Sequence, residues 1–179
     1  MSNATSTTQK PAIITLWSEN LCQTDNCLKV LEVKTIKEYP YITVSTIKTV
    51  AGATDPISTR KQVLLTLYQW RQLLGKAFLI DRQLSEVIVP PGLGLKVLAY
   101  DILATVGPVQ KRVQLVGLDG KVFISLIEFW CPPKATAFVP THKSVFLTPV
   151  EWRLLLQKAL PLQNFLEFSG YQGGVKPGI

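Results

Sequence analysis

Basic side chains and one tryptophan gather between residues 111 and 143 of this 179-residue chain. The set consists of Lys111, Arg112, Lys121, Trp130, Lys134 and Lys143. Cations along a groove neutralise phosphates, and a flat ring offers a base a stacking surface worth about 1 to 3 kcal/mol. The mixture therefore favours binding of a single-stranded nucleic acid without reading of its sequence. The plainer interpretation is that Trp130 packs in a core beside Phe129 and that the lysines are solvated charges.

The net charge of the chain supports a polyanionic partner. Nineteen lysines and arginines face 12 aspartates and glutamates, which gives a formal net charge of +7. The excess is shared, with ten basic and seven acidic residues before residue 90 and nine and five after it. We therefore expect both halves to contribute to one charged surface.

Catalytic chemistry has little support in the sequence. His142 is the only histidine, and the acidic residues are scattered without a paired arrangement. The three cysteines are an odd and sparse set without partners for a zinc site, so reduced thiols are expected. The glycine-rich residues 90–96 and 170–178 lack the lysine spacing of a phosphate-binding loop. We predict no catalytic residue, no metal and no cofactor.

Targeting signals are equally sparse. The apolar stretches have the length of strands, so no membrane-spanning segment is expected. Residues 1–11 lack the basic and apolar regions of a secretory signal. These patterns predict a soluble intracellular protein without a membrane partner.

The predicted strands and helix that must position the basic side chains occur twice in the sequence. Residues 61–77 match residues 143–159 at ten of 17 positions, with a constant offset of 82. Upstream at the same offset, residues 41–49 fall on 123–131 and share the alternation of apolar and polar side chains that is typical of half-buried strands. Each copy is therefore predicted to be a set of strands followed by one terminal helix, an α+β unit.

Both copies carry the same type of capping residues at the predicted helix start. Thr66 with Gln69, and Thr148 with Glu151, form capping boxes. Four residues into each predicted helix stands a tryptophan at a core position. The first helix is expected to bury residues at helical spacing, namely Trp70, Leu73, Leu74, Ala77 and Phe78. In the second helix Trp152 takes the core position, and Pro161 is expected to end or kink it.

These boundaries divide the chain into two repeats. We place repeat one at 12–84, a Pro-Pro-Gly linker at 85–94 and repeat two at 95–168, with flexible tails at 1–11 and 169–179. A sheet with one helix covers a single face and is marginal alone, so the copies are expected to pack helix against helix as a pseudo-dimer. The remaining sheet faces would be free to bind a partner.

The second copy resembles a known family. Residues 120–130 read GKVFISLIEFW, and residues 143–152 read KSVFLTPVEW. This pattern is similar to that of the single-stranded-DNA-binding transcriptional coactivator family called positive cofactor four. The resemblance covers about 50 residues, from Lys111 to near Leu160.

The resemblance implies both a fold and a function. The fold is a four-stranded antiparallel sheet followed by one helix, and two such units pair through their helices, here fused in one chain. Family members bind single-stranded DNA with little sequence preference and act in the nucleus, in transcription and DNA repair. The implied partners are single-stranded DNA and possible transcription or replication proteins, and no catalysis is implied.

Site residues carry over from the family position by position. Lys121, Trp130 and Lys143 match the family's basic and stacking residues. The departures, which remove expected contacts, fall at Leu118, Asp119 and Ile127.

The first copy has diverged further. Lys61 corresponds to Lys143, whereas Lys48 falls opposite Trp130 and Tyr39 opposite Lys121. The candidate contacts of this copy are Tyr39, Lys48, Arg60 and Lys61. Strand lysines are also ordinary solvated residues that protect sheet edges.

Two other functions remain open. A protein-interaction or structural module would keep the fold without the nucleic acid, with Phe123, Ile127 or Phe129 exposed as a partner surface. RNA is the other alternative, because stacking and phosphate contacts distinguish poorly between ribose and deoxyribose.

Overall fold

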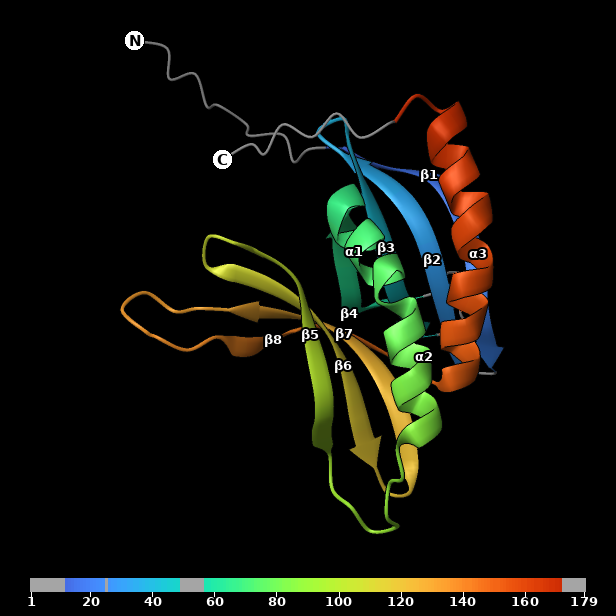
Figure 1. Ribbon diagram of the computed structural model, residues 1–179. Coiled ribbons are helices and arrows are strands. Elements are labelled where there is room, and N and C mark those ends of the chain that lie inside the picture. Colours follow the sequence, from blue (N-terminus) through green and yellow to red (C-terminus); the bar gives the residue numbers. More distant parts are fainter. Residues whose placement is uncertain (1–11, 25, 49–56, 172–179) are drawn as a thin grey trace.

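Two four-stranded antiparallel sheets form the body of the computed structural model (Figure 1). It describes residues 12–24, 26–48 and 57–171, with side chains from Lys61 onward in the third range. The strands of the first sheet, in spatial order, are β1 (Ile13–Thr24), β2 (Cys27–Ile36), β3 (Tyr39–Lys48) and β4 (Ile57–Thr66). The strands of the second are β5 (Lys96–Val106), β6 (Val109–Leu118), β7 (Lys121–Trp130) and β8 (Val139–Leu147). The predicted α+β class with two repeats is confirmed.

Helices follow each sheet. The first sheet leads into α1 (Leu67–Gly75) and α2 (Ala77–Glu86), and the second into α3 (Pro149–Phe168). Both predicted capping boxes are present, so Thr66 and Thr148 begin α1 and α3. Within the described residues, no helix has the length and apolar character needed to cross a bilayer.

The core repeats the sequence offset of 82. Trp70 and Trp152 are both almost fully buried, which confirms their predicted core positions. Ten pairs of core residues share this spacing: Leu21/Leu103, Leu31/Val113, Val33/Leu115, Ile42/Ile124, Val44/Leu126, Val63/Val145, Leu65/Leu147, Trp70/Trp152, Leu73/Leu155 and Ile80/Leu162. One contiguous cluster contains all of them. The two copies therefore share a single core related by a pseudo-twofold axis.

The repeats interlock, because α1 and α3 each pack against strands of both sheets. Helix α3 packs along β1, as Figure 1 shows, and α1 packs against β5, while β4 lies against β8. Two ion pairs hold equivalent positions across this boundary, Lys158 with Glu19 at 2.9 Å and Lys76 with Asp101 at 3.0 Å. The main contacts between the repeats therefore join helix to sheet and strand to strand, whereas the sequence suggested helix against helix.

Three details differ from the sequence prediction. The first helix is broken at Lys76, and Phe78, expected in the core, is 82% exposed because the break turns it outward. Helix α3 runs through Pro161 rather than ending there. Helix α2 reaches Glu86, two residues into the expected linker.

The polar partners of the two repeats have diverged more than the core. Lys29 of β2 reaches across to repeat two, where its Nζ donates to Glu151 Oε2 at 2.6 Å and to the Phe146 carbonyl at 2.7 Å. Its equivalent Lys111 pairs with Glu128 of the neighbouring strand, and the position equivalent to Glu151 is Gln69. Lys29 and Glu151 are therefore a cross-repeat contact that only one half makes.

Glu151 makes stability depend on pH. Burial raises the pKa of Glu151, but the Lys29 ammonium and the Thr148 backbone N–H outweigh burial and hold the pKa below its usual 4.5. Because the folded-state pKa is depressed, this stabilisation is present above the unfolded-state pKa of about 4.3 and is lost as the pH falls through the folded-state pKa.

We expect Glu151→Gln to lower the free energy of unfolding by about 1 to 3 kcal/mol at pH 7, because it removes a charge-assisted hydrogen bond. Glutamine at the equivalent Gln69 completes a capping box, so the helix start is retained. Urea unfolding at pH 7 and at pH 3 measures the effect, and the gap from wild type should narrow at pH 3. Glu19→Gln, at the more exposed pair with Lys158, is the control and should cost under about 1 kcal/mol. A gap that stays constant with pH would contradict this role of Glu151.

The two core tryptophans differ in one hydrogen bond. Trp152 Nε1 donates to Asp81 Oδ1 of α2 at 2.9 Å. Trp70 Nε1 is buried with no partner within the described residues. The residue equivalent to Asp81 is Gln163, so the acceptor has changed on one side of the pseudo-twofold axis.

Replacing each tryptophan by phenylalanine measures this difference. Trp152→Phe should lower the free energy of unfolding by about 1 kcal/mol more than Trp70→Phe, because only Trp152 loses a hydrogen bond while both lose the same ring volume. Chemical denaturation of the two variants provides the comparison. Equal losses would mean that the Asp81 hydrogen bond contributes nothing to stability.

Candidate functional site

The two faces of the second sheet have different chemistry. Strand alternation places Val113, Leu115, Ile124 and Leu126 on the face that joins the core. The opposite face carries exposed side chains of β5, with Val97 at 48%, Tyr100 at 58% and Ile102 at 44%. We call this second surface the open face. Nearer the middle of the sheet the side chains of this face are buried, among them Gln114, Val116 and Ser125, so a partner would meet mainly its β5 edge and the two ends of β7.

A guanidinium lies between two rings on the open face. The Arg112 guanidinium carbon is 3.9 Å from the centroid of Phe129 and 4.9 Å from that of Tyr100. Arg112 Nε donates to Gln110 Oε1, and Gln110 Nε2 donates to Thr105 Oγ1 at 2.9 Å, so Thr105 holds the glutamine that orients the guanidinium. Such contacts contribute about 0.5 to 2 kcal/mol each, depending on desolvation. We refer to Tyr100, Arg112 and Phe129 as the ring–guanidinium stack.

The stack includes one residue that the sequence proposed for the site and two that it did not. The sequence pattern indicates Arg112 as a contact, gives no such indication for Tyr100, and favours Phe129 only as a core or partner residue. Tyr100 belongs to β5, whose register against β6 shifts at two irregularities. Alternation within residues 96–106 could have suggested a face for Tyr100, but its position beside Arg112 depends on the strand register.

Lys111 takes part in a buried ion-pair network. Its side chain is 9% exposed and its ammonium pairs with Glu128 Oε2, while Lys143 Nζ reaches Glu128 Oε1 at 2.9 Å. Burial lowers the pKa of Lys111, and hydrogen bonding to Glu128 opposes that shift. Burial also raises the pKa of Glu128, but the two lysines outweigh it and the pKa lies below its usual value. Lys111 therefore does not present an exposed ammonium to a phosphate.

Lys111→Met tests whether this lysine is structural. Because a buried ion pair is often replaceable by an apolar group, and Glu128 keeps Lys143, we expect a change of under about 1 kcal/mol in the free energy of unfolding. Glu128→Gln should cost about 3 kcal/mol, since it leaves the Lys111 ammonium buried without a carboxylate. Urea denaturation at pH 7 ranks the two variants. The opposite ranking would show that Lys111 contributes more than its charge pairing.

Lys121 and Trp130 lie at opposite ends of β7. The nine residue steps between them span about 30 Å at 3.3 Å per residue. Alternation puts Lys121 on the open face and Trp130 on the same side of β7 as Glu128. Lys121 is exposed, and Trp130 is 40% exposed. The two residues therefore lie on opposite faces of the sheet as well as at opposite ends of β7, so a ligand that runs along the open face meets Lys121 but not Trp130.

A second group of candidates lies near the end of β7. Trp130 pairs with Val139 across the β7–β8 hairpin, and the exposed Lys134 lies in the connecting loop. Lys143 follows on β8, exposed yet paired with Glu128. We call Trp130, Lys134 and Lys143 the strand-end cluster. It supplies a ring and two ammonium groups, one of which is already engaged.

The first sheet retains fewer of these features. Tyr39 and Lys48 are exposed at opposite ends of β3, and Lys61 is exposed on β4 with an interaction of its own. Arg60 also belongs to β4, but its side chain lies outside the described residues. The positions equivalent to the ring–guanidinium stack are occupied by Ser18, Val30 and Ile47. The first sheet therefore has no counterpart of that stack.

The apolar partner surface expected from the sequence is changed in detail. Phe129 is only 8% exposed because it lies under the Arg112 guanidinium, so it does not form an exposed apolar patch. Phe123 and Ile127 are half-buried. Exposed aliphatic side chains of the open face are instead Val97 and Ile102 on β5 and Leu118 at the end of β6.

Metal chemistry and known relatives add no further assignment. Across the part of the chain that the structure describes, no three His, Cys, Asp or Glu side chains are grouped so that they could hold a metal ion. The sequence matches no protein-family model and no curated protein.

Proposed function

We propose that the chain binds single-stranded nucleic acid, DNA in the first place, on the open face of the second sheet and without reading its sequence. The observation that carries this proposal is the ring–guanidinium stack. The exposed Tyr100 ring offers a base a stacking surface, and the Arg112 guanidinium beside it offers a positive charge to a phosphate.

The positions of Lys121 and the ring–guanidinium stack on the open face suit a single-stranded nucleic acid that runs parallel to β7. Lys121 marks one end of this path, and the stack lies toward the other end, beside the Trp130 end of β7. The length of about 30 Å is suited to a strand of several nucleotides, and single-strand binding folds cover about 4 to 16 nucleotides each. The strand-end cluster lies beyond the stack, with Trp130 and Lys143 on the opposite side of β7, so only a nucleic acid that turns around the end of β7 would reach it.

The resemblance to the coactivator family supports DNA rather than RNA as the ligand and transcription as the process. In this chain the two subunits of such a dimer are fused, and the stack is present on one sheet only. We therefore propose one principal binding face per chain, with the first sheet contributing general positive charge.

A protein partner is the second candidate function. Val97 and Ile102 are exposed beside the stack, and exposed aliphatic groups on a sheet are suited to an apolar contact. Salt separates the two functions. Binding of a single strand weakens with a log–log slope of about 0.7 per neutralised phosphate, whereas an apolar contact changes little.

The test is a fluorescence-anisotropy titration with a labelled mixed-sequence single-stranded DNA of about 20 nucleotides, a length above the usual site size. Tyr100→Ala should weaken binding by about 5- to 150-fold, since one stacked base contributes about 1 to 3 kcal/mol. Tyr39→Ala, an exposed tyrosine of the first sheet, is the matched control and should leave affinity nearly unchanged. Trp130→Ala measures the contribution of the strand-end cluster.

Competition and salt complete the experiment. Duplex DNA should fail to displace the labelled strand, and an RNA competitor ranks the two acids. Equal losses from Tyr100→Ala and Tyr39→Ala would place the site elsewhere. Absence of binding at low salt would refute the nucleic-acid proposal and favour a protein partner.

A further inference from the structure

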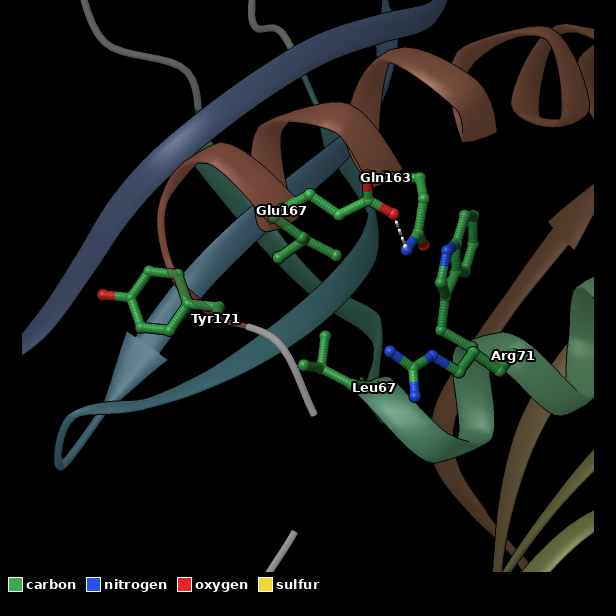
Figure 2. Close-up of a pocket in the computed structure, with 7 residues that line it drawn as sticks. Leu67, Arg71, Gln163, Glu167 and Tyr171 are labelled. Atoms are coloured by element: carbon green, nitrogen blue, oxygen red, sulfur yellow. Dashed lines mark hydrogen bonds between the residues drawn. The ribbon is translucent and has the colours of Figure 1, made fainter. Parts of the chain in front are cut away.

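A cavity of about 380 Å³ lies where the two repeats meet, between α1 and the last turns of α3. Its lining joins apolar, cationic and acidic groups: Leu67, Trp70, Arg71, Gln163, Leu166, Glu167 and Tyr171. Figure 2 shows Arg71 and Leu67 on one side of it, with Gln163 and Glu167 opposite and Tyr171 at one end. The volume is in the range of small-molecule sites in proteins. It is separate from the open face of the second sheet.

The pseudo-twofold axis shows what this cavity lacks. In the other half, the Asp81 carboxylate accepts a hydrogen bond from Trp152 Nε1 at 2.9 Å. The equivalent residues here are Gln163 and Trp70. The Gln163 amide instead donates to Glu167 Oε1 at 3.0 Å, drawn as the dashed line in Figure 2. The Trp70 indole N–H, on a side chain only 1% exposed, has no acceptor among the described residues.

A buried donor without an acceptor is costly, so a ligand that supplies one is favoured. Arg71 lies one residue after Trp70 and contributes a guanidinium to the same cavity, and guanidinium groups bind carboxylates through paired hydrogen bonds. Glu167 faces the same space, and its negative charge disfavours a dianion such as phosphate. Leu67 and Leu166 suit a short apolar body.

From these contacts we propose that the cavity binds a small monocarboxylate, which takes at Trp70 the place that the Asp81 side chain holds at Trp152. Gln163 must turn aside to admit it, because the indole nitrogen is buried. The partner that retains Gln163 is Glu167, an exposed residue near the end of α3, so this rearrangement breaks one hydrogen bond at the surface. The hydrogen bond from Trp152 to Asp81 thus shows, within the same chain, a carboxylate in the equivalent position.

The test follows the four tryptophan indole resonances of the full chain labelled with ¹⁵N-tryptophan. Trp70→Phe identifies the Trp70 signal. Sodium butyrate should move that signal downfield in a saturable manner while the Trp152 signal stays in place. Sodium chloride and inorganic phosphate at equal ionic strength are the comparison salts and should produce no saturable shift.

Two variants sharpen the result. Gln163→Asp restores the acceptor of the other repeat, so the Trp70 signal should already lie downfield and butyrate should no longer move it. Arg71→Gln should raise the butyrate dissociation constant at least about tenfold, because one charge-assisted contact is lost. An unmoved Trp70 signal in the wild-type chain, or a shift shared equally by chloride, would overturn the proposal. Neither result depends on the nucleic-acid site.

Discussion

Each four-stranded sheet of this chain has one apolar face, and the whole structure depends on covering it with elements of both repeats. Between the repeats, α3 packs along β1 of the first sheet and α1 packs against β5 of the second. Burial of Trp70 and Trp152 between helices and sheets gives each repeat a core that it shares with the other. Removing one repeat would therefore expose the apolar surface of the other, so we expect the duplication to fold as a single unit.

The two repeats differ more in their polar contacts than in their core positions. The apolar positions keep their partners at the offset of 82, because any change of volume in a close-packed interior is costly. Polar contacts are more replaceable, and three differ between the repeats. At the helix start, the second repeat has Glu151 where the first has Gln69, and Lys111 pairs with Glu128 whereas its equivalent Lys29 pairs with Glu151. The second repeat also has Gln163 where the first has Asp81. Gln163 in place of Asp81 leaves Trp70 without the acceptor that Trp152 has. Separate differences, at Ser18, Val30 and Ile47, confine the ring–guanidinium stack to the second sheet.

The packing of the helices against the sheets also determines which surfaces remain available to a ligand. Because helices occupy one face of the second sheet, its other face is left to Tyr100, Arg112 and Lys121. The lysines of that sheet are not equivalent. Lys111 is used inside the molecule to balance Glu128, whereas Lys121 stays exposed at the strand start. A positive net charge therefore says little about which cations meet a ligand until burial and pairing are known.

The local features of this protein can be predicted from its sequence. Capping chemistry at Thr66 and Thr148, the tryptophan positions and the alternation of strand residues depend on near neighbours, so the two repeats and their α+β class could be predicted. Tertiary structure alone decided what depends on distant segments. The Tyr100–Arg112 contact requires the β5–β6 register, the Lys29–Glu151 pair joins residues far apart in the chain, and the exposure of Phe78 follows from a break in the first helix. Spacing along a chain sets which face a side chain can occupy, but only packing decides which partner it finds there.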